Sequence, residues 1–237
     1  MHEREDSVLA PLLKRIAARF PQSWQHEMRR AFFRREIRLG RFVTDEKEFP
    51  LLDRWVEPGD WVLDIGANVG HYTKRMSELA GPEGRVIAFE PVPATFDLLA
   101  ANARLFPHEN VSLLNVAASD RTMSIGIQIP DFYQGMHNYY QASLSPDATD
   151  LRVLTISVDA LGIRSRIKLV KVDVEGHELP VLRGMLATIE RDHPAMIIET
   201  ASLDVIALIE SMGYETERLS KSSNVVCHPG KGHVPSR

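Results

Sequence analysis

The chain has 237 residues, of which 44% are hydrophobic and 25% charged, and its net charge is −4. These proportions are those of an ordinary globular protein and exclude collagen-like and low-complexity chains. The single cysteine, Cys227, excludes an internal disulfide framework and a cysteine-rich zinc site. No apolar run approaches the roughly 20 residues that a membrane-spanning helix needs.

The charge is distributed unevenly along the chain. Residues 1–41 carry ten Lys or Arg against five Asp or Glu, a net charge of +5, whereas residues 42–237 carry 18 against 27, a net charge of −9. Because contacts with nucleic-acid phosphates need clustered Lys and Arg, the acidic part argues against nucleic acid as the main partner. The first residues are acidic where an export signal needs a basic region, so we expect a cytoplasmic protein.

Two amphipathic helices are predicted in the basic N-terminal part, over residues 7–19 and 24–38, with Pro21 between them. Along the second helix an apolar stripe faces four arginines: Trp24, Met28, Phe32 and Ile37 against Arg29, Arg30, Arg34 and Arg35. Such a helix fits an anionic membrane or an anionic substrate. It equally fits a cap that packs on the rest of the protein with its arginines in solvent, and we favour the cap.

Strands and helices alternate from Trp61 onwards, because short apolar runs bounded by turn residues separate stretches with helical periodicity. The predicted strands are 61–65, 86–89, 111–116, 124–129, 152–158, 167–172 and 195–198, followed by a closing hairpin of 214–219 and 224–227. The predicted helices are 72–79, 94–105, 179–191 and 203–212. The pattern indicates an α/β fold with a doubly wound, mainly parallel sheet, closed by an antiparallel hairpin. We expect a helical extension over 1–45, one domain over 46–227 and a flexible tail over 228–237.

Acidic side chains stand at the carboxyl ends of four predicted strands: Asp64, Glu90, Asp173 and Glu199. In open α/β sheets, ligands bind at the carboxyl ends of the strands. The four acids therefore predict a binding site at this edge of the sheet.

A glycine-containing loop, from Gly66 to Gly70, follows the first of these strands and opens a helix. It lacks the third glycine of the dinucleotide fingerprint, so it suits a nucleoside better than a pyrophosphate. Glu90 lies 20 residues after Gly70. A carboxylate at that position can accept hydrogen bonds from both hydroxyls of a ribose.

Three segments carry a family resemblance: VLDIGANVGHYT, VIAFEPVPATFDLLAANA and LVKVDVEGHELPVLRGM. In this order and spacing, over about residues 46–200, the chain resembles the FkbM-type family of methyltransferases that depend on S-adenosylmethionine (SAM). The resemblance implies a class I methyltransferase fold. It also implies methyl transfer to a hydroxyl oxygen of a small molecule, sugar, glycolipid or polyketide-type metabolite. The basic N-terminal part lies outside the resemblance.

The resemblance also implies which residues hold SAM. Asp64 would orient the methionine ammonium, Tyr72 and Thr73 would help to hold its carboxylate, and Glu90 would hold the ribose. The turn after the third strand would border the adenine. The implied set is Asp64, Gly66, Ala67, Asn68, Gly70, Tyr72, Thr73, Glu90, Ala118 and Ser119.

The segment after the fourth main strand is the best candidate for chemistry. Methyl transfer is an in-line displacement, and a carboxylate or His can remove the proton of the acceptor hydroxyl. We expect Asp173 to position the acceptor or act as the base, with Glu175 and His177 in support. Lys171 fits a salt-bridge partner of these acids.

A magnesium ion would find hard oxygen ligands in Asp173 and Glu199. Thr200 rather than a second acid follows Glu199, so we favour a reaction without a metal. Residues 130–150 form a polar segment rich in aromatic side chains. Its ring-bearing residues either stack on the acceptor or cover the core: Tyr133, His137, Tyr139 and Tyr140.

Two other functions compete with methyl transfer to oxygen. A nicotinamide oxidoreductase is disfavoured by the missing third glycine and by the lack of a Tyr-x-x-x-Lys pair. A nucleoside-binding protein of the same fold without activity remains open, because binding residues persist after turnover is lost. Methylation of nitrogen would favour an Asn/Asp-Pro-Pro-aromatic segment, which Asp173-Val174-Glu175-Gly176 is not.

Overall fold

The computed structural model describes residues 21–133, 136–137, 142–145, 147–148 and 151–230. The helix predicted over residues 7–19 lies outside the described residues. So do Tyr139 and Tyr140 of the aromatic segment.

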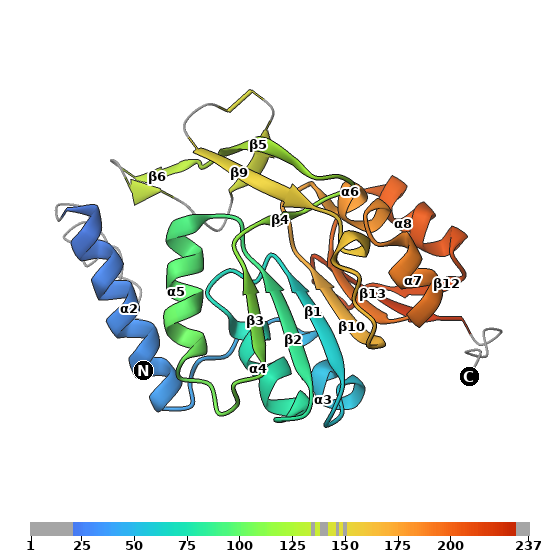
Figure 1. Ribbon diagram of the computed structural model, residues 1–237, viewed down its shortest axis with the longest axis horizontal. Helices are drawn as coiled ribbons and strands as arrows, with labels where there is room; N and C mark the ends of the chain where they lie inside the picture. The colour runs from blue at the N-terminus through green and yellow to red at the C-terminus, as the bar shows by residue number, and fades with distance from the viewer. Residues whose placement is uncertain (1–20, 134–135, 138–141, 146, 149–150, 231–237) are drawn as a thin grey trace.

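A seven-stranded sheet forms the centre of the molecule (Figure 1). Across the sheet the strands are β12 (Tyr214–Glu217), β13 (Asn224–Pro229), β11 (Ala195–Glu199), β10 (Ile167–Val172), β1 (Trp61–Ile65), β2 (Arg85–Phe89) and β3 (Val111–Leu114). Neighbours from β11 to β3 are parallel, and β13 is antiparallel to both β11 and β12. This arrangement confirms the predicted sheet and its closing hairpin.

Helices cover both faces of the sheet. One face packs on α6 (Glu178–Arg183), α7 (Leu186–Asp192) and α8 (Leu203–Ser211). The other packs on α3 (Leu52–Trp55), α4 (His71–Ala80) and α5 (Pro93–Ala103). Because the central strands are buried on both faces, they are continuous apolar runs rather than alternating ones. Two single-turn helices, η1 (Phe49–Leu51) and η3 (Asp159–Leu161), complete this part of the chain.

The single helix predicted over residues 179–191 is wrong, because the chain breaks at Gly184 into α6 and α7. Gly184 lies against the backbone of Ser119, where a Cβ atom would overlap the carbonyl oxygen. The N-terminus of α7 is capped by Asp159, whose carboxylate accepts hydrogen bonds from the backbone amides of Ala187 and Thr188. Close packing against a neighbouring loop, which local periodicity does not reveal, therefore divides the helix.

A second sheet lies across the carboxyl edge of the main sheet (Figure 1). Its strands, in order, are β4 (Ala117–Ala118), β9 (Leu151–Ile156), β5 (Met123–Gln128) and β8 (Ser143–Ser145). The sequence predicts β5 and β9 as alternating stretches but not their pairing, which is antiparallel. A further pair, β6 (Asp131–Tyr133) and β7 (Met136–His137), belongs to the same region of the chain.

Helix α2 (Gln22–Arg38) packs beside α5, as expected of a cap. Phe33 and Ile37 are buried there, and Asp97 of α5 accepts hydrogen bonds from Arg30 and pairs with His26, each at 2.5 Å. Of the predicted apolar stripe only Ile37 is buried, and Trp24, Met28 and Phe32 are exposed. The stripe was assigned from spacing alone, and the surface of α5 covers Phe33 together with Ile37 instead.

Strand β13 runs through Pro229 and so includes the first two residues of the predicted tail, because its last residues pair with the first residues of β12. Within the described ranges, no helix has both the length and the apolar character needed to cross a bilayer.

Replacing Gly184 by alanine should destabilise the protein by about 1–3 kcal/mol, the usual cost of overpacking. Gly184 has φ −79°, which alanine adopts freely. The loss of stability therefore comes from the clash with Ser119 and not from backbone strain. In thermal unfolding, each 1 kcal/mol lost should lower Tm by about 2–4 °C. The exposed neighbour provides the control, since Arg183→Ala should change stability by less than about 0.5 kcal/mol. An unchanged Tm in Gly184→Ala would contradict this packing.

Candidate functional site

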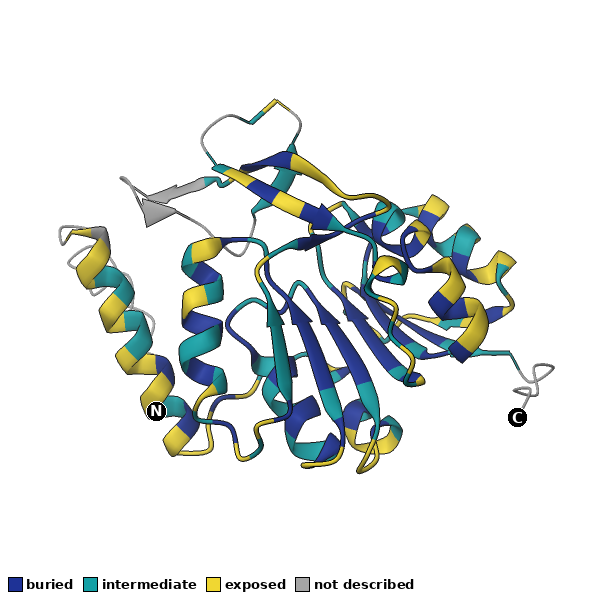
Figure 2. Ribbon diagram, in the orientation of Figure 1, coloured by how far each residue is buried: buried dark blue, intermediate teal, exposed yellow. Residues whose placement is uncertain are grey.

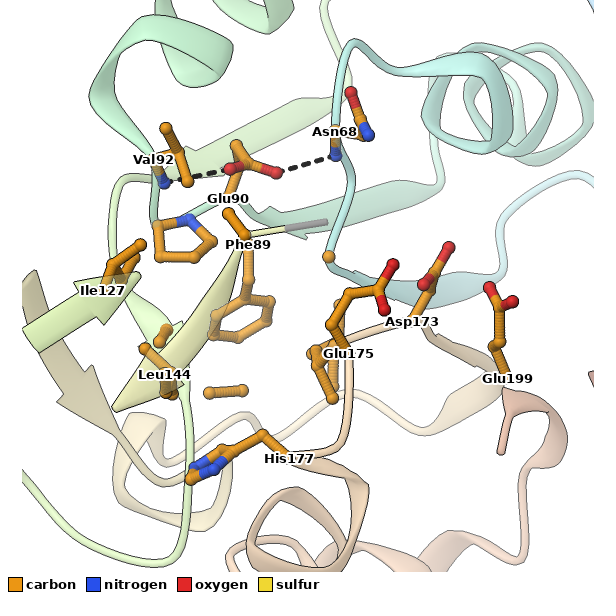
Figure 3. Close-up of a pocket in the computed structure, with 17 residues that line it drawn as sticks. Asn68, Phe89, Glu90, Val92, Ile127, Leu144, Asp173, Glu175, His177 and Glu199 are labelled. Carbon is orange, nitrogen blue, oxygen red and sulfur yellow. Dashed lines mark hydrogen bonds between the residues drawn. The ribbon is translucent and has the colours of Figure 1, made fainter. Parts of the chain in front are cut away.

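A cavity of about 230 Å³ lies between the carboxyl edge of the main sheet and the second sheet (Figure 3). One part of its lining is acidic, with Asp173, Glu175 and Glu199, while a fourth acid, Glu90, lies apart from them beside Val92. The opposite part is apolar and consists mainly of Phe89, Pro91, Val92, Ala118, Ile127 and Leu144. The cavity thus joins a charged end to an apolar end at the edge where the sequence predicts a site.

The loop after β1 closes tightly onto the strand ends. The amides of Gly66 and Ala67 both donate to the carbonyl oxygen of Phe89, at 3.0 and 2.9 Å. Gly66 has φ +83°, and a Cβ atom there would overlap the carbonyl oxygen of Asp173. Glycine is therefore required for two reasons, the left-handed backbone and the close approach of two strand ends.

Glu90 is fixed at the cavity by two backbone donors. The amide of Asn68 donates to Oε2 and the amide of Val92 to Oε1, each at 2.9 Å (Figure 3). Burial raises the pKa of Glu90 to about 7, although both hydrogen bonds act in the opposite direction. Each carboxylate oxygen keeps a second lone pair, so Glu90 can accept two more hydrogen bonds from a ligand.

Asp64 lies beneath the cavity rather than in its lining. Its carboxylate accepts a hydrogen bond from the hydroxyl of Thr73 at 2.5 Å, and its partner in the β1–β10 register is Lys171. Burial raises the pKa of Asp64 to about 6, against the effects of Thr73 and Lys171. Asp64 and Thr73 are therefore hydrogen-bonded to each other, and neither residue lines the cavity.

Lys171 is buried at the centre of a polar network that the sequence does not reveal. Its Nζ lies 3.4 Å from Oδ2 of Asp173 and donates to Oδ1 of Asn224 at 3.2 Å. The amide nitrogen of Asn224 in turn donates to the carboxylates of Glu46 and Glu48. The salt bridge confirms the predicted role of Lys171.

Tyr72 belongs to this network and not to the cavity. Its hydroxyl donates to Glu46 at 2.8 Å, and Lys171 Nζ lies 5.0 Å from the centre of its ring. Burial, together with Glu46, raises the pKa of Tyr72. Tyr72 does not line the cavity, and its expected role in holding the SAM carboxylate stays a prediction.

Three carboxyl groups meet at the acidic end of the cavity, those of Asp173, Glu175 and Glu199 (Figure 3). Burial, followed by the charge of Asp173, raises the pKa of Glu199. Burial also raises the pKa of Glu175, with Asp173 second. Glu175 has φ +45° and is followed by Gly176 at +89°. A non-glycine residue held in this conformation is typical of functional sites.

His177 lies apart from the three carboxyl groups, toward Leu144 (Figure 3). Its Nε2 is 2.9 Å from the hydroxyl oxygen of Ser119, and burial lowers its pKa. A histidine held there borders the apolar end of the cavity. The structure therefore separates two of the predicted catalytic residues, Asp173 and Glu175, from the third.

The structure brings eight of the fourteen predicted site residues whose side chains it describes to one cavity. Those in its lining are Gly66, Asn68, Glu90, Ala118, Asp173, Glu175, His177 and Glu199. Those outside the lining are Asp64, Ala67, Gly70, Tyr72, Thr73 and Ser119. The side chains of Tyr133 and His137 lie outside the described residues. Sequence reasoning missed Ile127 and Leu144, although the alternation in residues 124–129 already indicated a strand with one buried face.

No group of three or more His, Cys, Asp or Glu side chains is arranged to hold a metal ion, as far as the described residues show. Asp173 and Glu199, the ligands predicted for a possible magnesium ion, do lie together. The favoured reaction without a metal ion stays a prediction.

Comparison with known proteins gives matches to methyltransferases. Residues 64–216, more than half of the chain, match the methyltransferase FkbM domain family. The chain is 34% identical over 139 residues to the hexuronic acid methyltransferase AglP of Haloferax volcanii, covering 57% of this chain and 54% of AglP. It is 27% identical over 148 residues to Methyltransferase 1 of Beauveria bassiana, covering 53% and 58%. The chain thus spans about half the length of these curated relatives.

A solved structure shares the fold. The crystal structure of an FkbM methyltransferase from Methylobacillus flagellatus superposes with a TM-score of 0.52 at 15% identity, over 72% of this chain and 44% of that one.

The raised pKa of Glu90 predicts a specific dependence of stability on pH. Between the ordinary value of 4.5 and about 7 the folded protein keeps a proton that the unfolded chain has lost, so the free energy of unfolding should fall as the pH rises through this window. At about 1.4 kcal/mol per pKa unit, the contribution of Glu90 is roughly 3 kcal/mol.

Denaturant unfolding from pH 4 to 8 measures this effect. Glu90→Gln should remove the part of the decrease due to Glu90 and leave a part of similar size due to Asp64, with the contributions of Glu175 and Glu199. The exposed Glu83→Gln should keep the wild-type curve. Parallel curves for wild type and Glu90→Gln would contradict the burial of an ionisable group at this position.

Proposed function

Because the chain belongs to the FkbM methyltransferase family, we propose that it transfers a methyl group from SAM to a hydroxyl oxygen of a sugar. The observation that carries the proposal is the cavity itself, in which Glu90 stands at one end of the strand edge and Asp173 at the other. The first is a carboxylate with free acceptor capacity, and the second is a carboxylate beside a buried ammonium group.

The residues of the cavity fit a nucleoside with a positively charged sulfur. SAM supplies a methyl group bound to that sulfur. Glu90 accepts hydrogen bonds from the two ribose hydroxyls. The adenine packs against the apolar side of the cavity, which includes Ile127 and Leu144. Because Gly66 has no Cβ atom, the loop after β1 can pack directly against the backbone of Asp173. The acidic end favours the cationic sulfur electrostatically.

Asp173 receives the proton of the acceptor hydroxyl. The ammonium group of Lys171 lies 3.4 Å from Oδ2 of this carboxyl group. Asp173 lines the cavity, where its carboxyl group aligns the acceptor oxygen with the methyl carbon. Glu175 binds a neighbouring hydroxyl of the acceptor.

We propose an uncharged acceptor, although the relative AglP is named for a hexuronic acid. A second hollow of about 350 Å³ adjoins the cavity and shares Glu175 and Glu199 with it. The cation in its lining is Arg218, whose guanidinium donates to the carbonyl oxygens of Thr200 and Ser223, each at 2.6 Å. Carboxylates accept hydrogen bonds from sugar hydroxyls but repel a second carboxylate, so this lining favours a neutral glycan.

A nucleoside-binding protein without activity remains the second candidate. It would keep Glu90 and the apolar wall but would not need the salt bridge between Lys171 and Asp173. We place the protein in the cytoplasm, where SAM is made, and take a neutral glycan rather than nucleic acid as its partner.

Binding of the cofactor tests the first half of the proposal. Isothermal calorimetry should show micromolar binding of SAM and S-adenosylhomocysteine and none of NAD(P)H. Glu90→Ala should weaken binding by about tenfold to a hundredfold, since it removes two hydrogen bonds to a charged group. Glu83→Ala, an exposed change, should leave affinity unaltered. Binding of NAD(P)H without SAM would refute the assignment.

Methyl transfer from radiolabelled SAM to neutral sugars and to hexuronic acids tests the second half. Asp173→Asn should lower kcat by about a hundredfold to ten-thousandfold, the contribution of a general base. Its affinity for S-adenosylhomocysteine should stay within about threefold, and the exposed Asp204→Asn should be fully active. A preference for hexuronic acids would contradict the uncharged acceptor. Equal losses of affinity and rate in Asp173→Asn would assign Asp173 to binding instead.

A further inference from the structure

The outward side of α2 carries a row of large apolar side chains. Trp24, Met28 and Phe32 follow one another at intervals of four residues and are 63%, 43% and 55% exposed. At this spacing they share one face of the helix, opposite the face that buries Phe33 and Ile37. Figure 2 shows α2 at the outer edge of the molecule, beside α5. We call Trp24, Met28 and Phe32 the outer stripe.

Arginines border the outer stripe. Arg34, Arg35 and Arg38 are exposed, and α2 as a whole carries five arginines against two glutamates. A hollow of about 290 Å³ also opens where α2 meets α5. Its charged lining residues are Arg30, Arg34, Arg104 and Asp97. The apolar row therefore lies next to a surface with an excess of positive charge.

Charge decides among the partners that could cover the outer stripe. Residues 7–19 of the chain carry Lys14, Arg15 and Arg19 and no acid, so laying them on the stripe would put cations beside the arginines of α2. A second copy of α2, related by a twofold axis, would likewise set arginine against arginine. An anionic surface matches both the stripe and its border.

We propose that α2 is an interfacial helix that docks the protein on an anionic lipid bilayer. The outer stripe enters the boundary between headgroups and acyl chains, and the bordering arginines contact lipid phosphates. The opposite face of the helix stays packed on α5 through Phe33, Ile37 and the pair of Arg30 with Asp97. The site at the sheet edge is not needed for this docking.

Sedimentation with lipid vesicles tests the proposal on the full chain. The wild type should sediment with vesicles of equal parts phosphatidylglycerol and phosphatidylcholine, should remain in solution with pure phosphatidylcholine, and should be released by high salt. A triple variant, Trp24→Ser with Met28→Ser and Phe32→Ser, should bind these vesicles with an affinity lower by roughly tenfold or more. Leu203→Ser removes an equally exposed apolar side chain, 79% exposed on α8, and should bind as the wild type does.

Tryptophan fluorescence gives a second readout. Brominated acyl chains should quench the emission of the vesicle-bound wild type and should quench Trp24→Phe much less. The triple variant should keep the wild-type Tm, because its three side chains are exposed.

Several results would overturn the docking proposal. Equal sedimentation of the triple variant and the wild type would do so, as would no sedimentation of the wild type at low salt. A dimeric wild type and a monomeric triple variant, neither binding vesicles, would identify the stripe as a self-association surface. A lowered Tm of the triple variant without vesicle binding would show that residues of the same chain cover it.

Discussion

The carboxylates at the sheet edge depend on one buried ammonium group, that of Lys171. Asp64 is its partner in the register, Asp173 lies 3.4 Å away, and Asn224 links it to Glu46 and Glu48. Without this charge the buried carboxylates of Asp64 and Glu48 and the half-buried ones of Asp173 and Glu46 would have no cation in this network to offset them, which is unfavourable. The position of Lys171 in the middle of an apolar strand is therefore a condition for the acidic end of the cavity.

The same strand edge separates two kinds of acid. Glu90 receives two backbone hydrogen bonds and lies beside the apolar wall that the second sheet supplies. Asp173 instead lies beside a cation and two other carboxyl groups. The two carboxyl groups thus stand in different environments, and the proposed roles of ribose binding for Glu90 and proton removal for Asp173 follow from that difference. The loop at Gly66 sets the distance between them, because its backbone packs directly on Asp173.

The sequence was sufficient for the parts of the molecule that local patterns determine. The alternation of strands and helices and the closing hairpin predicted the main sheet, and the three motif segments identified the family, whose class I methyltransferase fold is confirmed. The features that depend on distant contacts were missed. The break at Gly184 arises from Ser119, and the true buried face of α2 is chosen by the surface of α5. Glu46, Glu48 and Asn224 carry no motif, so only the folded chain shows that they surround Lys171.

A crystal structure with bound S-adenosylhomocysteine tests the site most directly. The ribose hydroxyls should lie within hydrogen-bonding distance of the two carboxylate oxygens of Glu90, with the adenine against Ile127 and Leu144 and the sulfur facing Asp173. A nucleoside bound elsewhere, with Glu90 contacted only by the amides of Asn68 and Val92, would contradict the division of roles between the two carboxylates.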